Sequence, residues 1–239
     1  MLYCKQKPSP AAASLLCRRT CERRTPVKNY VKIPSALNTD VHLKVIDGHF
    51  VTSHSHTTAF LDFTTMRTRC SEAHGVATLL SMRYSLHTPV DTIVCLDGTT
   101  VIGTYLAEEL TRSGILSYNA HRTIYVVAPE YVSGGQMIFR ENLQIALRNK
   151  HVLLLVGAVT TGLTLKAAAD SVACCQATVS GAAAIFSTLD EVNGIPIAAA
   201  FHSTDLPQYR YYRQEDCPLC REKIAVDAIA NSYGYSRLD

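Results

Sequence analysis

The sequence predicts an α/β fold with a mostly parallel sheet flanked by helices. Short apolar, β-branched segments alternate with longer segments whose apolar residues recur at helical spacing, as in successive βαβ units. The strand segments are continuously apolar, which indicates that both faces of the sheet are covered. Of the 239 residues, 47% are hydrophobic and 18% charged. This composition can fill a core, and it excludes wholesale disorder.

The predicted strands are short, and the clearest is the run HVLLLV at His151–Val156. Asp47–Asp62 is expected to form two strands around a polar turn of histidine and serine. The other predicted strands are 91–96, 123–128, 177–186 and 195–201.

Three helices are predicted between these strands. Met66–Leu86 carries apolar residues at helical spacing, Thr104–Arg112 is followed by Gly114 as a stop signal, and Leu163–Cys175 is rich in alanine. The segment Pro129–Gly135 contains the residues typical of a turn and is expected to be a loop.

The formal net charge of +3 is unevenly distributed. Residues 1–30 hold seven basic residues and one acidic residue, whereas residues 31–239 hold 16 basic and 19 acidic residues. With its prolines and without apolar periodicity, the segment 1–30 is predicted to be a disordered basic tail. A transit peptide, or a start codon assigned too far upstream, is the alternative. The main domain is then 31–239.

Composition also bears on compartment and partners. The nine cysteines are odd in number and irregular in spacing, which favours a reducing cytoplasm over a secreted disulfide scaffold. No apolar run approaches the roughly 18 residues of a membrane helix, so no membrane association is expected. The small net charge argues against a dedicated nucleic-acid binder. Binding of nucleic acid through the basic tail ranks below the functions considered next.

Ligands of open parallel sheets bind beyond the carboxyl ends of the strands, here the loops after Leu96 and after Val156. The second loop reads GAVTTGLT over residues 157–164 and runs into a predicted helix. Its small residues, its hydroxyls and the helix N-terminus suit a phosphate group. The motif is neither a Walker loop nor a GxGxxG fingerprint. An ordinary strand-to-helix turn capped by threonine is the alternative.

The segment VLLLVGAVTTGLT, Val152–Thr164, resembles the phosphoribosyl-pyrophosphate motif of type I phosphoribosyltransferases. Leu96–Glu109 resembles the pyrophosphate loop and following helix of that family, and Asp216–Cys220 is similar to a Cys-Pro-x-Cys element of many orotate phosphoribosyltransferases. The resemblance implies the type I phosphoribosyltransferase fold. It also implies a small hood built from residues 40–65 and 200–239.

The resemblance implies roles for two groups of residues. One group would hold the 5-phosphate of phosphoribosyl pyrophosphate, and it comprises Gly157, Thr160, Thr161, Gly162, Leu163 and Thr164. The other would meet pyrophosphate, with Asp97 as the candidate catalytic residue that orients Mg²⁺ or a water, and with Gly98, Thr99 and Thr100.

The chain departs from the family pattern at two places. The two acidic residues that bind the ribose hydroxyls in the family correspond to Val156 and Gly157. The mobile loop, which is basic in orotate enzymes, corresponds to Ala128–Phe139 and contains no Lys or Arg. Cations of this kind would neutralise the leaving pyrophosphate. The nearby basic residues of the chain stand outside the family positions, and they are Arg122, Arg140, Lys150 and Lys166.

Cys217 and Cys220 form a CxxC and are the candidate metal ligands. A structural zinc site needs four ligands, and no second cysteine pair exists. A local structural turn is favoured, with zinc completed by other residues or by a second subunit, or a redox pair, as alternatives.

For the histidines at 49, 54 and 56, strand alternation places His54 and His56 on one face. A polar turn is favoured there over base contacts or a metal site. The tyrosines and arginines of 209–213 are candidates for stacking on a base.

The leading hypothesis is an orotate phosphoribosyltransferase-like enzyme that transfers phosphoribose from phosphoribosyl pyrophosphate to a pyrimidine base with Mg²⁺. It would act as a homodimer in the cytoplasm. The alternative is a non-catalytic regulatory protein of the same fold that binds a phosphoribosyl compound or nucleotide, because Val156 and Gly157 replace the acidic pair.

Overall fold

The structure of the chain is a computed structural model that describes residues 30–84, 87–112, 117–120, 123–132 and 135–238. Its contacts divide the chain into residues 1–30 and residues 31–239, and the second unit is the subject here. Apart from Tyr30, the predicted basic tail lies outside the described residues, as does Gly114.

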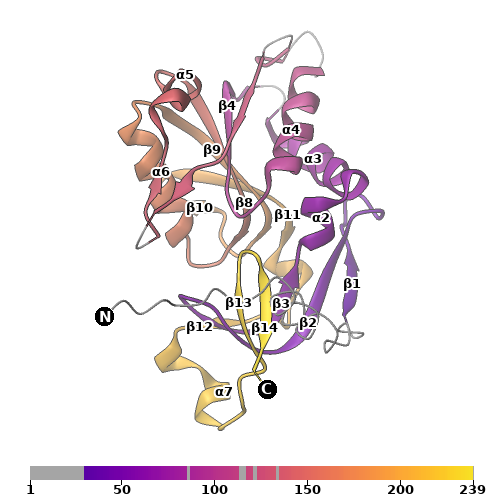
Figure 1. The fold of residues 1–239 in the computed structure, drawn as a ribbon. Helices are drawn as coiled ribbons and strands as arrows, with labels where there is room; N and C mark the ends of the chain where they lie inside the picture. The colour runs from indigo at the N-terminus through magenta and orange to yellow at the C-terminus, as the bar shows by residue number, and fades with distance from the viewer. Residues whose placement is uncertain (1–29, 85–86, 113–116, 121–122, 133–134, 239) are drawn as a thin grey trace, which may run out of the picture. The chain divides into compact units, whose positions relative to one another are not determined.

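A mostly parallel sheet forms the centre of the domain (Figure 1). Its order is β10-β11-β9-β8-β4-β5, in which β11, β9, β8, β4 and β5 are parallel and β10 is antiparallel. The strands are β4 (Thr92–Cys95), β5 (Tyr125–Val127), β8 (His151–Val159), β9 (Thr178–Ser187), β10 (Glu191–Val192) and β11 (Ile195–His202). The predicted fold class is therefore confirmed.

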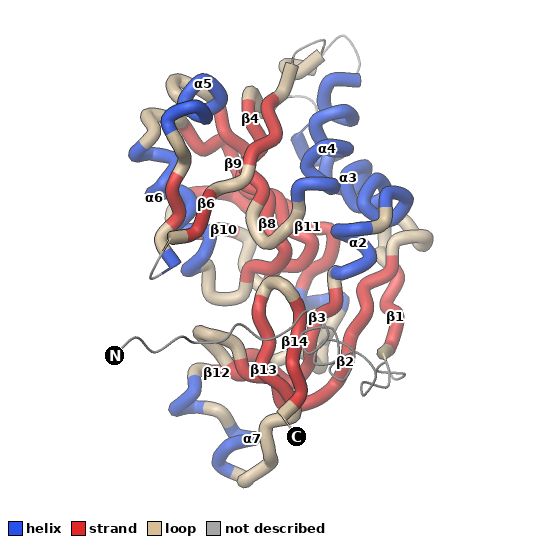
Figure 2. The backbone as a smooth tube through the Cα atoms, in the orientation of Figure 1, coloured by secondary structure: helices blue, strands red, loops and turns tan. Residues whose placement is uncertain are grey.

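Helices cover both faces of this sheet (Figure 2). Along β8, the side chains of Leu153 and Leu155 join one buried cluster, and those of Val152 and Leu154 join another. The first cluster includes residues of α3 (Cys70–Tyr84) and α4 (Thr100–Arg112), and the second those of α5 (Gln144–Leu147) and α6 (Leu163–Cys174). Covering on both faces explains why the strands are continuously apolar.

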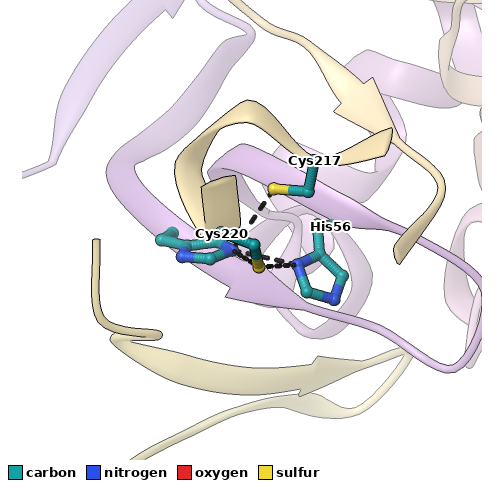
Figure 3. Close-up of side chains that lie close together, drawn as sticks. His56, Cys217 and Cys220 are labelled. Carbon is teal, nitrogen blue, oxygen red and sulfur yellow. Dashed lines mark hydrogen bonds between the residues drawn. The ribbon is translucent and has the colours of Figure 1, made fainter. Parts of the chain in front are cut away.

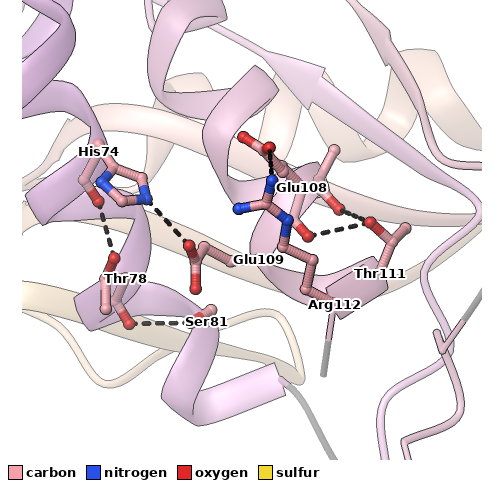
Figure 4. A network of polar contacts seen from close by, with 8 residues as sticks. His74, Thr78, Ser81, Glu108, Glu109, Thr111 and Arg112 are labelled. Carbon is pink, nitrogen blue, oxygen red and sulfur yellow. Dashed lines mark hydrogen bonds and ion pairs between the residues drawn. The ribbon is translucent and has the colours of Figure 1, made fainter. Parts of the chain in front are cut away.

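Polar contacts support the packing of α3 against α4 at its edge (Figure 4). The imidazole Nε2 of His74 lies 2.9 Å from Oε1 of Glu109 on the neighbouring helix. Within α4, Arg112 pairs with Glu108 at 2.6 Å, four residues earlier. These partly exposed contacts add little stability compared with the buried cluster beneath them.

A second sheet forms the hood, in the order β12-β3-β2-β13-β14 with β1 on β2. Its strands come from both ends of the domain: β1 (Val31–Pro34), β2 (His42–Val51), β3 (His56–Asp62), β12 (Tyr211–Tyr212), β13 (Ala228–Asn231) and β14 (Gly234–Arg237). The short helices η3 (Ser203–Asp205), η4 (Gln214–Asp216) and α7 (Pro218–Arg221) lie in the C-terminal part. The predicted strands around a His/Ser turn correspond to β2 and β3.

Four predicted elements differ most clearly in extent from those observed. The helix expected from residue 66 is divided into α2 (Thr64–Thr68) and α3, because the chain is extended at Arg69. The expected loop 129–135 contains β6 (Glu130–Tyr131), which pairs with β7 (Met137–Ile138) ahead of the short helix η2 (Glu141–Leu143). The helix expected from 104 begins at Thr100, and β8 continues to Val159.

Within the described part of the chain, every helix is too short or too polar to cross a bilayer.

Candidate active site

The candidate site lies where the strand order of the main sheet reverses direction. From β4 the chain continues to β5 on one side, whereas from β8 it continues to β9 and β11 on the other side. Neighbouring parallel strands whose connections leave in opposite directions open a crevice at their carboxyl ends, where ligands of such sheets bind. The residues after β4 and after β8 therefore lie next to each other at this crevice. Both loops were predicted to bind the ligand.

The turn after β4 has an unusual backbone. Asp97 and Gly98 have φ values of 53° and 73°, both in the left-handed region. The turn is closed by the N–H of Thr99, which donates to the carbonyl of Leu96 at 3.0 Å. A non-glycine residue in this region is strained, and such strain concentrates at functional sites. Gly98 is exposed in this turn, and the Asp97 side chain is directed toward Gly157 of β8.

The Asp97 carboxylate lies against Gly157 of the neighbouring strand. The N–H of Gly157 donates to Oδ2 of Asp97 at 3.3 Å. A Cβ placed on Gly157 would lie 3.7 Å from that oxygen. Position 157 is one of the two where the family resemblance expects an acidic residue. A carboxylate is thus present beside this position, but it comes from β4 instead of β8.

Burial raises the pKa of Asp97, while the Gly157 N–H and the charge of Arg67 act in the opposite direction. The net shift means that the site destabilises the ionised carboxylate, since desolvation is the largest effect. A bound cation or a hydrogen-bond donor from a ligand would offset this cost. The Asp97 carboxylate is therefore a candidate to bind a cation or a ligand hydrogen-bond donor.

Thr99, predicted to meet pyrophosphate, is fully buried. Its hydroxyl donates to the carbonyls of Leu96 at 2.7 Å and Leu155 at 3.1 Å. It therefore joins the ends of β4 and β8 and does not present its hydroxyl to a ligand. Gly98 and Thr100 are exposed, so a ligand can reach them.

Replacing Thr99 by valine is expected to lower the free energy of unfolding by about 1–3 kcal/mol, because two buried carbonyls lose their side-chain donor. Urea unfolding of both proteins measures this difference. Thr104→Val, at an exposed position of α4, is the matched control and should change stability by less than about 0.5 kcal/mol. Equal stability of the Thr99 variant and the parent would contradict the structural role.

The loop after β8 is shorter than the sequence suggested. Because β8 extends to Val159, Gly157 and Ala158 belong to the strand, and the turn itself is Thr160–Gly162 before α6. Gly162 has φ 77°, and a Cβ there would lie 2.7 Å from Cγ2 of Val192. Only glycine fits this position, both in backbone conformation and in space.

The Thr160–Gly162 turn is held by a hydrogen bond on one side and borders a hollow on the other side. Thr188 of the neighbouring loop donates its hydroxyl to the carbonyl of Thr160 at 3.1 Å. On the other side, residues Ala158–Leu165 line a hollow of about 30 Å³, into which the turn and the start of α6 face. The first turn of α6 carries no acidic residue, so its dipole is left available for an anion. All six residues predicted to hold a phosphate belong to this strand end, turn and helix start.

Arg67 is a cation of this site that the sequence analysis did not identify. From α2 its Nη1 donates to the carbonyl of Asp97 at 2.5 Å and also to that of Ser232 in the β13–β14 turn. Burial lowers the pKa of Arg67, and the charges of Asp97 and Asp62 partly offset this effect. Arg67 lies in a segment predicted to be helical, and no motif marks it, so only its position in space reveals it.

The basic residues considered from the sequence do not replace Arg67. Lys150 precedes β8, so it lies roughly 30 Å away from the end of that nine-residue strand. Arg140 donates two hydrogen bonds of 2.6 Å to the carboxylate of Glu130. Lys166 is exposed in the first turn of α6. Arg122 lies outside the described residues.

The hairpin β6–β7 occupies the position of the expected mobile loop in the chain. Burial raises the pKa of Tyr131 to about 12, and the charges of Asp97 and Tyr233 contribute in the same direction. The hairpin thus carries an exposed tyrosine in the segment where the family resemblance expects a cation.

A cavity of about 410 Å³ joins the phosphate-binding turn to the hood. Its wall combines Thr161 with residues of the β2–β3 turn and of the C-terminal segment: His54, Ser55, Tyr211, Tyr212, Arg213 and Asp216. Tyrosine rings and an arginine suit a planar ring that bears polar groups. Within the aromatic segment predicted to stack on a base, Tyr209 instead packs edge-on against Phe186 in the core, with ring centroids 5.3 Å apart.

The histidine and cysteine predictions require a correction. His54 is exposed in the β2–β3 turn, whereas His56 is buried in β3 and faces the buried His49 of β2. The CxxC lies beside them, and the ligand atoms of His49, His56, Cys217 and Cys220 all fall within 4.8 Å of one another. Neither an isolated polar turn nor an isolated cysteine turn describes these residues, because the hood sheet brings the two segments together (Figure 3).

Two solved structures are similar to this chain, and the first, with a TM-score above 0.5, supports the fold. A UMP synthase from Leishmania donovani superposes with a TM-score of 0.51 and 15% sequence identity over 68% of this chain and 34% of that chain. An orotate phosphoribosyltransferase from Aeropyrum pernix has a TM-score of 0.48 at 15% identity, covering 69% and 91% of the two chains. The fold is the type I phosphoribosyltransferase fold.

The sequence comparison is more specific. A curated orotate phosphoribosyltransferase from Chlorobaculum parvum is 30% identical over 132 residues, which are 55% of this chain and 60% of the relative. The chain thus matches less than two thirds of that relative's length. No family model matches the chain. The resemblance to orotate phosphoribosyltransferases is confirmed by this match.

Proposed function

We propose that the protein is a phosphoribosyltransferase that transfers phosphoribose from phosphoribosyl pyrophosphate to a pyrimidine base, with orotate as the first candidate. One observation carries the proposal: the Asp97 turn and the Thr160–Gly162 turn leave adjacent strands at the reversal of strand order, beside a cavity that reaches the hood. The resemblance to orotate phosphoribosyltransferases supports the choice of base.

Each part of the site has a role in this proposal. The Thr160–Gly162 turn and the N-terminus of α6 hold the 5-phosphate. Gly98 and Thr100 meet the pyrophosphate, and Arg67 supplies positive charge close to that loop. The Asp97 carboxylate faces the ribose from the side of Gly157. The reaction is a displacement at the anomeric carbon, and binding and orientation supply most of the rate enhancement.

Mg²⁺ belongs to the proposal, and the donor set fits it. Mg²⁺ bound to substrate phosphates needs only one or two protein carboxylates and retains several waters. The partly buried Asp97 is one such carboxylate at the crevice. When bound, the ion would neutralise charge on the pyrophosphate.

An assay of the purified protein with orotate, phosphoribosyl pyrophosphate and Mg²⁺ tests the proposal. We expect loss of orotate absorbance and release of pyrophosphate. Thr161→Ala and Thr164→Ala should each raise KM for phosphoribosyl pyrophosphate about 10-fold, since each removes a hydroxyl that would donate to a charged phosphate. Thr178→Ala, at the exposed start of β9, is the control and should leave KM unchanged. No turnover at high protein concentration would exclude the enzyme.

A specific observation favours a second candidate, a non-catalytic protein that binds a phosphoribosyl compound or nucleotide. Val156 has none of its surface exposed and belongs to the core, so the ribose site lacks one acid of the family pair entirely. This candidate predicts calorimetric binding of a nucleoside monophosphate without product formation. Unchanged binding by Thr161→Ala and Thr164→Ala would remove the phosphate site from both candidates.

The homodimer implied by the family resemblance and the cytoplasmic location favoured by the cysteine pattern are part of the proposal. A dimer would allow a partner subunit to supply further cations to the site. Light scattering of the purified chain gives its mass in solution, and a monomer at assay concentration would exclude that contribution.

A further inference from the structure

The four ligand atoms in the hood are spaced as a metal ion requires. Nε2 of His49 lies 3.0 Å from Nδ1 of His56 and 3.6 and 3.7 Å from the sulfurs of Cys217 and Cys220. Nδ1 of His56 lies 3.3 Å from Sγ of Cys220. In a tetrahedral zinc site the edges are about 3.3 Å between nitrogens and about 3.6 Å between nitrogen and sulfur. The observed distances are within about 0.3 Å of these values.

The tautomer of His49 is fixed in the form that binds a metal. Its Nδ1 lies 3.1 Å from the carbonyl oxygen of Ile224, which can only accept, so Nδ1 carries the proton. In the neutral ring Nε2 then bears a lone pair directed at the other three ligand atoms. A backbone carbonyl on the outer nitrogen is the usual partner of a metal-binding histidine.

The local backbone aims these side chains at one another. The register of β2 with β3 shifts between Asp47 and Phe50, which is a bulge containing Gly48 and His49. A bulge changes the alternation of side chains, so His49 turns to the same side as His56. Asp227 secures the bulge, because its Oδ2 accepts from the N–H of His49 at 2.7 Å.

The cysteines are arranged on a single helical turn. Pro218 occupies the first position of α7, where its fixed φ starts a helix and its missing N–H costs nothing. Cys217 precedes this helix and Cys220 lies within it, three residues on, so both sulfurs face the histidines (Figure 3). Cys217 is buried and Cys220 is exposed, which gives an ion a route to the site.

We propose that His49, His56, Cys217 and Cys220 bind one structural zinc ion. Two nitrogens and two sulfurs in tetrahedral spacing suit zinc, and four protein ligands leave no open position for catalysis. The ion joins parts of the chain that are far apart in sequence, as His56 and Cys220 are 164 positions from each other.

The zinc ion also sets the width of the cavity in the hood. Ser55 lines that cavity and precedes the ligand His56, and Asp216 lines it and precedes the ligand Cys217. The ion therefore fixes the two walls of the cavity relative to each other. This inference does not depend on the proposed transferase activity, since the site is defined by its own four ligands.

Elemental analysis of the purified full-length protein, prepared without chelators, tests the proposal. We expect about one zinc per chain, and replacement by Co²⁺ should give the visible absorption of a tetrahedral thiolate site. Cys217→Ser and His56→Asn should each reduce zinc to less than about a tenth of that value. Cys174→Ser and His54→Asn, with exposed side chains outside the cluster, are matched controls that should keep it.

If a variant of a zinc ligand does not fold, zinc removal from the parent protein still tests the proposal. A strong chelator should remove the zinc and lower the melting temperature, and added Zn²⁺ should restore it. The proposal is overturned by a folded parent protein that holds no zinc and gains none from added Zn²⁺. Detection of a Cys217–Cys220 disulfide in the parent by mass spectrometry, or full zinc content in the folded ligand variants, would overturn it as well.

Discussion

Asp97→Asn is expected to lower kcat/KM for phosphoribosyl pyrophosphate about 100-fold and to raise the melting temperature at neutral pH. The loss of activity follows because the amide carries no charge to interact with a bound cation or with the ribose hydroxyls, contacts that contribute about 1.5–3 kcal/mol. The gain in stability follows because the site desolvates the ionised carboxylate. Steady-state kinetics and thermal unfolding of the same preparations measure both effects.

The pH dependence of this stability gain has a definite sign. Because burial raises the pKa of Asp97, the folded chain binds that proton more tightly than the unfolded chain does. The parent therefore loses stability as pH rises through the raised pKa, whereas the asparagine variant does not. The two proteins should converge in melting temperature below the ordinary aspartate pKa of about 3.9 and differ most at neutral pH.

Asp170→Asn serves as the control, since Asp170 is an exposed aspartate of α6 away from the crevice. It should alter neither the kinetics nor the pH dependence of melting. An Asp97→Asn protein with full activity would show that the carboxylate has no part in the reaction. Lower stability of that variant at neutral pH would contradict the assigned cost of burying the charge.

Val156→Asp, which introduces an acid at the family position, is expected to lower the free energy of unfolding by more than about 3 kcal/mol. Val156 has no exposed surface and packs in the apolar cluster between the sheet and α6. An aspartate there would be an unpaired charge in the core. Urea unfolding at several pH values measures the effect.

Val156→Asn separates the cost of charge from the cost of shape and polarity. The aspartate variant should be the less stable of the two at neutral pH, and the difference between them should shrink as the new carboxyl is protonated in acid. A stable Val156→Asp protein with tighter binding of phosphoribosyl pyrophosphate would place Val156 in the ligand site and contradict its assignment to the core.

The sequence by itself determined the central architecture, because the signals for its strands, turns and helices lie in short stretches of the chain. The apolar run at 152–156 is sufficient to predict a strand covered on both faces, and it lies in the first two thirds of β8. The glycine and threonines of 160–164 mark a turn before a helix by their conformational and hydrogen-bonding preferences. Element boundaries were less predictable. The end of β8 at Val159 depends on its pairing with β9, and the interruption at Arg69 depends on how α2 and α3 pack.

Tertiary structure decided how the site is completed, since its contacts join residues that no local pattern relates. Asp97 lies beside Gly157 because β4 and β8 are neighbours in the sheet, so a carboxylate missing from one strand is found on another. Arg67 reaches the same turn from α2 without any motif. In the hood, strand alternation paired His54 with His56, but His54 lies in the turn before β3, and the bulge at Gly48–His49 brings His49 of β2 to His56 instead. Local preferences therefore determined the strands and turns of this protein, whereas strand order and a single bulge determined which side chains meet.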